Sequence, residues 1–221
     1  MLERFLKQTT FSSQEDFMKN FRVEVPENFN FGYDVVDAWA EEQPDKKALL
    51  WVGKDKEKID FTFADIKRES DRAASYFTSL GIEKGDRVML ILKRHYEFWF
   101  SIIALHKIGA VCIPATHLLM PHDIVYRNNA AGVKMIVACG DKEVTDRIDE
   151  AMPLSSTVKL RVSVGPYVPQ GWEDFHKGLR EAAPFVRPEH VNTNDDISLM
   201  YFTSGTTGNP KMVAHDFTYP L

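Results

Sequence analysis

A nine-residue segment near the end of the sequence has the composition of a loop that binds phosphate groups. Residues 203–211 are Thr-Ser-Gly-Thr-Thr-Gly-Asn-Pro-Lys and stand between two apolar runs. Glycine lets the backbone approach a ligand closely and adopt unusual φ angles, so that N–H groups can point at an anion. The hydroxyl groups add donors, and Lys211 adds a positive charge without a fixed geometry. The segment therefore predicts a nucleotide-phosphate loop.

Two other interpretations of this segment explain less of it. A plain turn between strands accounts for the glycines, the asparagine and the proline, but it gains nothing from four hydroxyl side chains and a lysine. A Walker A loop, G-x-x-x-x-G-K-[ST], requires a different spacing from that of Gly205 and Gly208. It also requires a Ser or Thr directly after Lys211 and a helix that begins there, and the sequence shows neither.

The elements that would position this loop alternate regularly along the chain. Apolar runs rich in β-branched residues begin at intervals of 23, 24 and 25 residues, and helix-like stretches separate them. This alternation predicts an α/β fold in which βαβ units form a mostly parallel sheet flanked by helices. The runs begin near Val88, Val111, Met135 and Leu160, and the helical stretches cover residues 95–107, 121–130 and 142–152.

The loop itself is predicted to join two strands. Residues 197–202 form an apolar run that leads into it, and residues 212–214 form another that leaves it. The preceding stretch, residues 163–196, contains several prolines, so we expect an irregular connection with a short helix over residues 172–183. Its aromatic residues need packing partners, which argues against a flexible linker: Trp172, Phe175 and Phe185.

The N-terminal third shows a separate pattern. We expect a short helix over residues 33–43 and a β-hairpin formed by residues 48–52 and 59–63. Thr62 then opens a capping-box-like start, with Asp65 in the place of the usual glutamate. The helix that follows has one buried face and ends at Gly81; this face carries Ile66, Ser70, Ala73, Phe77 and Leu80.

Composition restricts the class of protein. The 221 residues are 44% hydrophobic and 27% charged, as in ordinary globular proteins, and the net charge of −5 gives no reason to expect nucleic acid. Cys112 and Cys139 stand in apolar runs and are predicted to be buried free thiols. The N-terminus lacks a signal-peptide core, and the apolar window 98–115 divides into a helix and a strand. We therefore expect a cytoplasmic protein without a membrane span.

Several other residues could be given functional roles, but a structural role explains each of them better. His215 is expected to be a packed histidine at a strand end rather than part of an acid pocket. Four histidines lack metal-ligand spacing, so no metal site is predicted. The aromatic cluster of residues 96–100 is expected to pack in the core, and Asp195 and Asp196 to cap a turn. The four histidines are His95, His106, His117 and His122.

Residues 201–211 resemble the signature of AMP-forming acyl-CoA synthetases, luciferases and peptide-synthetase adenylation domains. Residues 62–66, 85–88 and 107–111 are similar to segments found throughout this adenylate-forming superfamily. Residues 26–31, 34–40 and 215–220 look like the branch that activates short- and medium-chain fatty acids. The likeness extends from about residue 20 to the end.

This resemblance implies a reaction in two steps. A carboxylate attacks the α-phosphate of ATP to give an acyl-adenylate, and coenzyme A then displaces AMP, with Mg2+ assisting the phosphate chemistry. By motif position, Thr203, Ser204, Gly205, Thr206, Thr207 and Gly208 would hold the β- and γ-phosphates, and Lys211 would neutralise their charge. The family's ligands are thus a small carboxylic acid, ATP and coenzyme A. The resemblance indicates no oligomeric state.

The family's remaining site residues, including its adenylation lysine, would follow residue 221. We therefore expect residues 1–221 to be the N-terminal portion of an AMP-binding domain, without catalytic residues of its own and inactive alone. Its parent would be an ATP-dependent acid:CoA ligase. A peptide-synthetase adenylation domain and a nucleotide-binding module without catalysis are the alternatives. A carrier-protein domain further along the gene would favour the first alternative, and a native stop codon after Leu221 the second.

Overall fold

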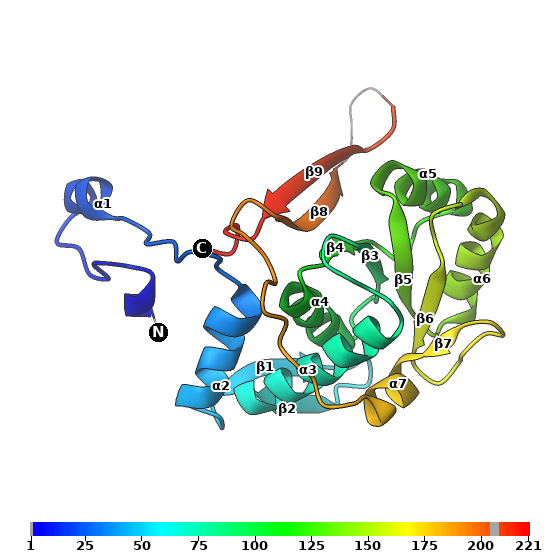
Figure 1. Ribbon diagram of the computed structural model, residues 1–221, viewed down its shortest axis with the longest axis horizontal. Coiled ribbons are helices and arrows are strands. Elements are labelled where there is room, and N and C mark those ends of the chain that lie inside the picture. The colour runs from blue at the N-terminus through cyan, green and yellow to red at the C-terminus, as the bar shows by residue number, and fades with distance from the viewer. Residues whose placement is uncertain (1, 204–207) are drawn as a thin grey trace.

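A seven-stranded sheet forms the centre of the computed structural model, which describes residues 2–203 and 208–221 (Figure 1). The strand order is β7-β6-β5-β3-β4-β8-β9, and all neighbours are parallel except β8 and β9. The predicted mostly parallel sheet is confirmed. The strands are β3 Arg87–Ile91, β4 Val111–Pro114, β5 Val133–Cys139, β6 Leu160–Val164, β7 Glu173–Asp174, β8 Ile197–Thr203 and β9 Lys211–Asp216.

Helices cover both faces of this sheet, which explains why its central strands are apolar without alternation. Successive side chains of a strand point to opposite faces. Val88 and Leu90 of β3 accordingly belong to the core beneath one helical layer, whereas Met89 and Ile91 belong to the core beneath the other. The first layer contains α3 Phe63–Ser79, α4 Glu97–Ile108 and α7 Phe175–Glu181, and the second α5 Pro121–Ala131 and α6 Lys142–Ala151.

The predicted hairpin and the helix after it are both confirmed. β1 Lys47–Val52 and β2 Lys58–Thr62 pair antiparallel as a separate two-stranded sheet. The Asp65 N–H donates to the Thr62 hydroxyl, and the Asp65 carboxylate accepts the Thr62 N–H in return. Aspartate therefore closes the capping box as glutamate would.

The helix predicted over residues 33–43 begins earlier than expected. A π-helical segment, η2 Phe31–Asp37, precedes α2 Ala38–Glu42. The Asn30 side chain accepts the Gly32 N–H and caps the helix there, two residues before the predicted start. A Cβ at Gly32 would lie 2.9 Å from Cγ of Lys107, so only glycine lets η2 approach α4 this closely.

Short elements and loops complete the chain. The N-terminal arm contains η1 Leu2–Arg4 and α1 Gln14–Asn20, and η3 Met152–Leu154 follows α6. The predicted short helix over 172–183 is α7, preceded by the two-residue strand β7, which the sequence did not predict. Trp172 and Phe175 are buried there, as expected. No helix in the described part of the chain is long and apolar enough to cross a membrane, and the window 98–115 divides into α4 and β4.

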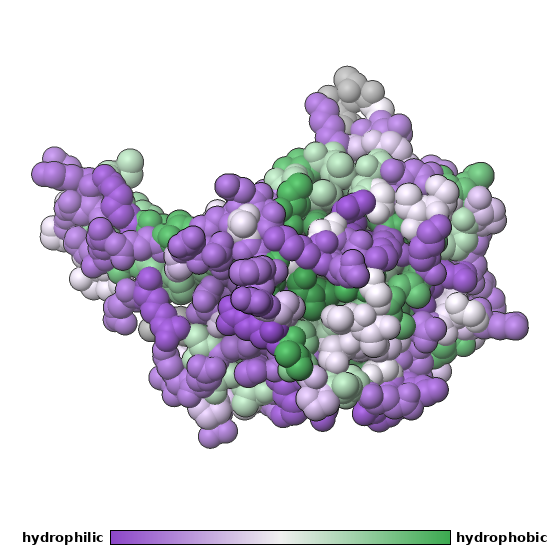
Figure 2. All heavy atoms as spheres, in the orientation of Figure 1, coloured by the Kyte–Doolittle hydropathy of each residue, from purple (hydrophilic) through white to green (hydrophobic). Residues whose placement is uncertain are grey.

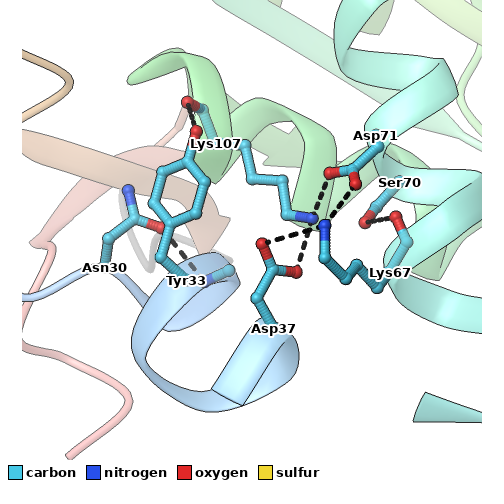
Figure 3. A network of polar contacts seen from close by, with 8 residues as sticks. Asn30, Tyr33, Asp37, Lys67, Ser70, Asp71 and Lys107 are labelled. Atoms are coloured by element: carbon cyan, nitrogen blue, oxygen red, sulfur yellow. Dashed lines mark hydrogen bonds and ion pairs between the residues drawn. The ribbon is translucent and has the colours of Figure 1, made fainter. Parts of the chain in front are cut away.

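A fully buried lysine holds the first helical layer together (Figure 3). The Lys107 ammonium on α4 lies 2.7 Å from Asp37 of η2 and 2.5 Å from Asp71 of α3. Lys67 contacts Asp71 at 2.6 Å and Asp37 at 3.7 Å, which balances the two carboxylates with two ammonium groups. The Tyr33 hydroxyl also donates to the Lys107 carbonyl at 2.8 Å. Three elements thus meet at one ionic cluster.

Replacing this lysine should destabilise the protein strongly. In Lys107→Met, Asp37 and Asp71 would share only Lys67, and an uncompensated buried charge costs about 3–5 kcal/mol. Denaturant unfolding followed by far-UV circular dichroism measures the free energy of unfolding. The control is Lys142→Ala, which removes an exposed i,i+4 pair with Asp146 and should cost less than about 1 kcal/mol. Equal losses in the two variants would contradict a structural role for the Lys107 cluster.

A second buried carboxylate joins α4 to α7. Glu97 is 3% exposed; one of its oxygens lies 3.2 Å from His176 of α7, and the other lies 3.6 Å from His95. Burial raises the pKa of Glu97, but the contacts with His176 and His95 outweigh it and lower the pKa to about 2. The contact with the Glu97 carboxylate in turn raises the pKa of His176 above its usual value.

The contact between Glu97 and His176 should make stability depend on pH. Because the folded pKa of His176 is raised, its contribution is complete below the unfolded value of 6.5 and is lost as the pH rises through the folded value. The folded pKa of Glu97 is lowered, so its contribution is present above 4.5 and lost as the pH falls toward 2. His176→Gln should therefore lower Tm most between pH 4.5 and 6.5 and least above that range.

Thermal melts at a series of pH values test this, with His190→Gln as the control. His190 is a highly exposed histidine 3.9 Å from Glu189, so its replacement should leave Tm nearly unchanged at every pH. A Tm difference between wild type and His176→Gln that is independent of pH would contradict the charge pairing.

Candidate functional site

The β8–β9 hairpin carries the predicted loop at the carboxyl edge of the parallel strands. β8 is parallel to β4 through the pair Cys112↔Leu199, so both strands end toward the same edge. β9 returns antiparallel to β8, with Thr203 opposite Lys211 at the root of the loop. The hairpin projects beyond the rest of the sheet in Figure 1. Ligands of open α/β sheets bind at this carboxyl edge.

The structure describes only part of the predicted phosphate loop. Thr203 ends β8 and Lys211 begins β9, both exposed, and the Thr203 hydroxyl donates to the Lys211 carbonyl at 3.4 Å. Gly208 has φ of +129°, a conformation that favours glycine, and a Cβ there would meet no atom within 4 Å. The described ends of the loop are therefore open to a ligand. The other predicted phosphate ligands lie outside the described residues: Ser204, Gly205, Thr206 and Thr207.

Apolar side chains gather beneath the hairpin, on a face that is otherwise mostly hydrophilic (Figure 2). Tyr201, Met212 and Val213 on its strands are each between 37% and 44% exposed. The strands of the hairpin are therefore only partly covered by the rest of the chain.

A cleft of about 780 Å³ opens at the same edge of the sheet. The chain leaves β3 toward α4 on one face of the sheet and leaves β4 toward α5 on the other. Two adjacent parallel strands whose connections diverge in this way create a crevice between their carboxyl ends, the usual ligand site of open α/β sheets. The cleft is lined by residues 92–95 after β3, residues 114–117 at and after the end of β4, and residues 51–54 of the β1–β2 hairpin.

The cleft wall carries positive charge and a strained residue. Lys93 has φ of +44°, which is uncommon for a residue with a side chain and characteristic of functional sites. Its ammonium lies 2.5 Å from Asp141, the N-cap of α6, and this contact raises the pKa of Lys93. Trp51 donates its indole N–H to the Arg94 carbonyl at 2.6 Å and joins the β1–β2 hairpin to this wall. With Lys54 and Arg94, the wall is suited to an anionic group.

The sequence pattern did not predict this cleft. One signal was present, because Lys93 and Arg94 directly follow the apolar run of β3. Their meeting with residues 114–117 depends on β3 and β4 being neighbours, and hydrophobic periodicity does not fix strand order.

The lower-rated candidates lie where structural roles explain them. His215 packs against Tyr219, with ring centroids 3.9 Å apart, and Asp196 accepts the Thr193 N–H at 2.7 Å in a turn. Of the aromatic cluster, Phe100 is buried but Trp99 is 47% exposed, so the expectation of core packing fails for Trp99. Cys112 and Cys139 are buried and free, as predicted. Over residues 2–203 and 208–221, no three His, Cys, Asp or Glu side chains group in a way that could hold a metal ion.

Comparison with protein-family models finds one match, the AMP-binding enzyme family, over residues 36–219. Curated relatives include acyl-coenzyme A synthetase ACSM5 of Rattus norvegicus, a mitochondrial protein, which is 34% identical over 197 residues. This match covers 86% of the chain and 34% of the relative. The mitochondrial acyl-coenzyme A synthetase ACSM4 of Mus musculus is 34% identical over 209 residues, covering 91% of the chain and 36% of the relative.

Solved structures agree on the fold. The N-terminal domain of FACL13 from Mycobacterium tuberculosis, in an inhibitor complex, matches with a TM-score of 0.72 at 28% identity, covering 85% of the chain and 44% of that structure. The anthranilate CoA ligase AuaEII, bound to anthranoyl-AMP, matches with a TM-score of 0.74 at 21% identity, covering 87% of the chain and 36% of that structure. The chain thus spans about a third of the length of the curated relatives.

Proposed function

Because the chain belongs to the AMP-binding enzyme family, we propose that it supplies the nucleotide-phosphate site of an ATP-dependent carboxylic acid:CoA ligase. The observation that carries the proposal is the position of residues 203–211, which join two strands at the carboxyl edge of a parallel sheet. The synthetase relatives support a ligase of this class, and we propose a short- or medium-chain acid as its substrate.

The proposed chemistry makes an unreactive carboxylate into an acyl donor. The acid's oxygen attacks the α-phosphate of ATP, the bond to the β-phosphate oxygen breaks, and pyrophosphate leaves with the electron pair. The thiol of coenzyme A, on losing its proton, then attacks the acyl carbon, and AMP leaves. The protein's task in the first step is to position the phosphates and to stabilise the charge that develops on them.

Three of the described loop residues have a proposed part in that step. The Thr203 hydroxyl and the backbone around Gly208 would donate to phosphate oxygens, together with Ser204, Gly205, Thr206 and Thr207. Lys211, level with Thr203 across the hairpin, would offset negative charge on the leaving pyrophosphate. Mg2+ would enter with the nucleotide.

The cleft beside β3 and β4 would receive a second part of the bound substrates. Its lysine and arginine residues favour a negatively charged group, such as a phosphate of ATP or of coenzyme A.

The cytosol stays our predicted location for the protein, although the two relatives named above are mitochondrial.

Two other functions remain as alternatives. A peptide-synthetase adenylation domain would share the first step, but the curated synthetase relatives favour a CoA ligase. A nucleotide-binding module without catalysis would use the same loop and would bind ATP without exchanging its pyrophosphate.

The 221-residue polypeptide should not adenylate acids by itself. It spans about a third of the length of its relatives, so most of an adenylation site would come from other residues. We expect no ATP–pyrophosphate exchange from the purified 221-residue polypeptide and robust exchange from the full-length protein with a suitable acid in a carboxylic-acid panel. Exchange by the polypeptide alone would contradict the first expectation, and full-length protein that binds ATP without exchange would favour the non-catalytic module.

Lys211→Ala in the full-length protein should separate the two steps. Loss of a charge that stabilises the leaving pyrophosphate should slow adenylation by roughly 10²-fold. Thioester formation from supplied acyl-adenylate should change little, because that substrate lacks the β- and γ-phosphates. Lys58→Ala is the control, since Lys58 is also an exposed lysine that begins an antiparallel strand, and it should affect neither step. Equal losses in both steps for Lys211→Ala would contradict a phosphate role.

A further inference from the structure

One helix contacts both strands at the root of the proposed phosphate loop. The Tyr126 hydroxyl on α5 donates to the Pro210 carbonyl at 3.0 Å, directly before Lys211 on the strand that leaves the loop. The Tyr126 ring meets Phe202 edge-on, with centroids 6.2 Å apart, directly before Thr203 on the entering strand. The Tyr126 side chain thus contacts the residue directly before each described end of the loop, Phe202 before Thr203 and Pro210 before Lys211.

Arg127 reinforces the contact on the entering strand. Its guanidinium carbon lies 5.3 Å from the centroid of the Phe202 ring, within the range of a cation–π interaction. The Asp123 carboxylate holds the guanidinium with a contact of 3.3 Å to Arg127 Nη1. It also accepts a hydrogen bond from the Met120 N–H at the start of α5. The arginine is therefore fixed by the same residue that caps its helix.

We propose that Tyr126 is a positioning residue for phosphate binding, because its hydroxyl sets the orientation of the peptide that enters Lys211. The peptide group is planar and trans, so the Pro210 carbonyl and the Lys211 N–H point in opposite directions. A carbonyl held toward α5 therefore turns the Lys211 N–H away from α5. Pro210 has no N–H of its own, which leaves this carbonyl as its sole backbone hydrogen-bonding group.

The hydroxyl matters because it ties the end of the β8–β9 ladder, where Thr203 pairs with Lys211, to the helical layer beneath it. β8 pairs with β4 through a single bridge at Leu199, and β9 is the edge strand of the described sheet. Residues 202 and 210 lie beyond that bridge, and there the contacts from α5 connect the hairpin to the rest of the fold. Without the hydroxyl, the Pro210 peptide could rotate while the ring still packed on Phe202.

This inference rests on the proposed phosphate role of the loop, and Tyr126→Phe in the full-length protein tests it. The change removes one hydrogen bond and keeps the ring, so Tm should change little. We expect kcat/KM for ATP in ATP–pyrophosphate exchange to fall about three- to tenfold. Thioester formation from supplied acyl-adenylate should keep its wild-type rate, because no β- or γ-phosphate takes part. Amide hydrogen exchange at Lys211 should quicken.

Tyr76→Phe is the matched control. The Tyr76 hydroxyl also donates to a backbone carbonyl, that of Asp174, at 3.4 Å, but in the helical layer on the opposite face of the sheet. Its loss should leave both half-reactions unchanged. A purely structural role for Tyr126 would slow both half-reactions together, and that result would overturn the proposal.

Lys211→Ala separates failure of this inference from failure of the proposed function. If Lys211→Ala slows adenylation selectively and Tyr126→Phe matches wild type, only the positioning role of Tyr126 is wrong. If Lys211→Ala leaves adenylation unchanged, the phosphate role of the loop is wrong, and the role of Tyr126 falls with it.

Discussion

An ammonium group without exposed surface must be paired, and the pairing of Lys107 determines how the first helical layer assembles. Asp37 and Asp71 reach it from η2 and α3, so the N-terminal segment cannot leave α4 without stranding a buried charge. Burial raises the pKa of Asp37 more than Lys107 lowers it, which shows that desolvation is the larger effect at this site. Desolvation offsets much of the attraction in a buried ion pair, so the main effect of the cluster is to fix which elements meet.

The position of α4 then sets the geometry of the cleft. α4 follows β3 on one face of the sheet, and α5 follows β4 on the other, so the carboxyl ends of the two strands are left open between them. The loop of residues 203–211 projects at the same edge, because β8 is parallel to β4. The segment that lines the crevice after β4 continues into α5, and α5 supports the loop through Tyr126. One stretch of chain therefore connects the two parts of the proposed site.

Much of the secondary structure could be predicted because local patterns encode it. The capping box at Thr62, the βαβ spacing and the strands around the loop all depend on neighbours within a few residues. Predictions failed where distant contacts decide. Helix η2 begins early because Asn30 caps it while its amide donates to the His106 carbonyl and to Asn192, and the two-residue β7 is held by pairing with β6. Trp99 is exposed although its neighbours suggested the core. The roles of the loop residues stay predictions, and four of them lie outside the described residues.

The sequence by itself determined the chemistry available to this protein: a glycine- and hydroxyl-rich loop closed by Lys211, the strands that carry it, and the family resemblance that the comparison confirmed. These features are local, since residue type and spacing along a few turns or strands suffice to specify them. Only the tertiary structure decided that β5 pairs with β3 rather than with β4, that Lys107 is buried between two aspartates, and that Tyr126 reaches Pro210. These contacts join residues far apart in the chain, and they are selected by the packing of whole layers, which hydrophobic periodicity does not encode.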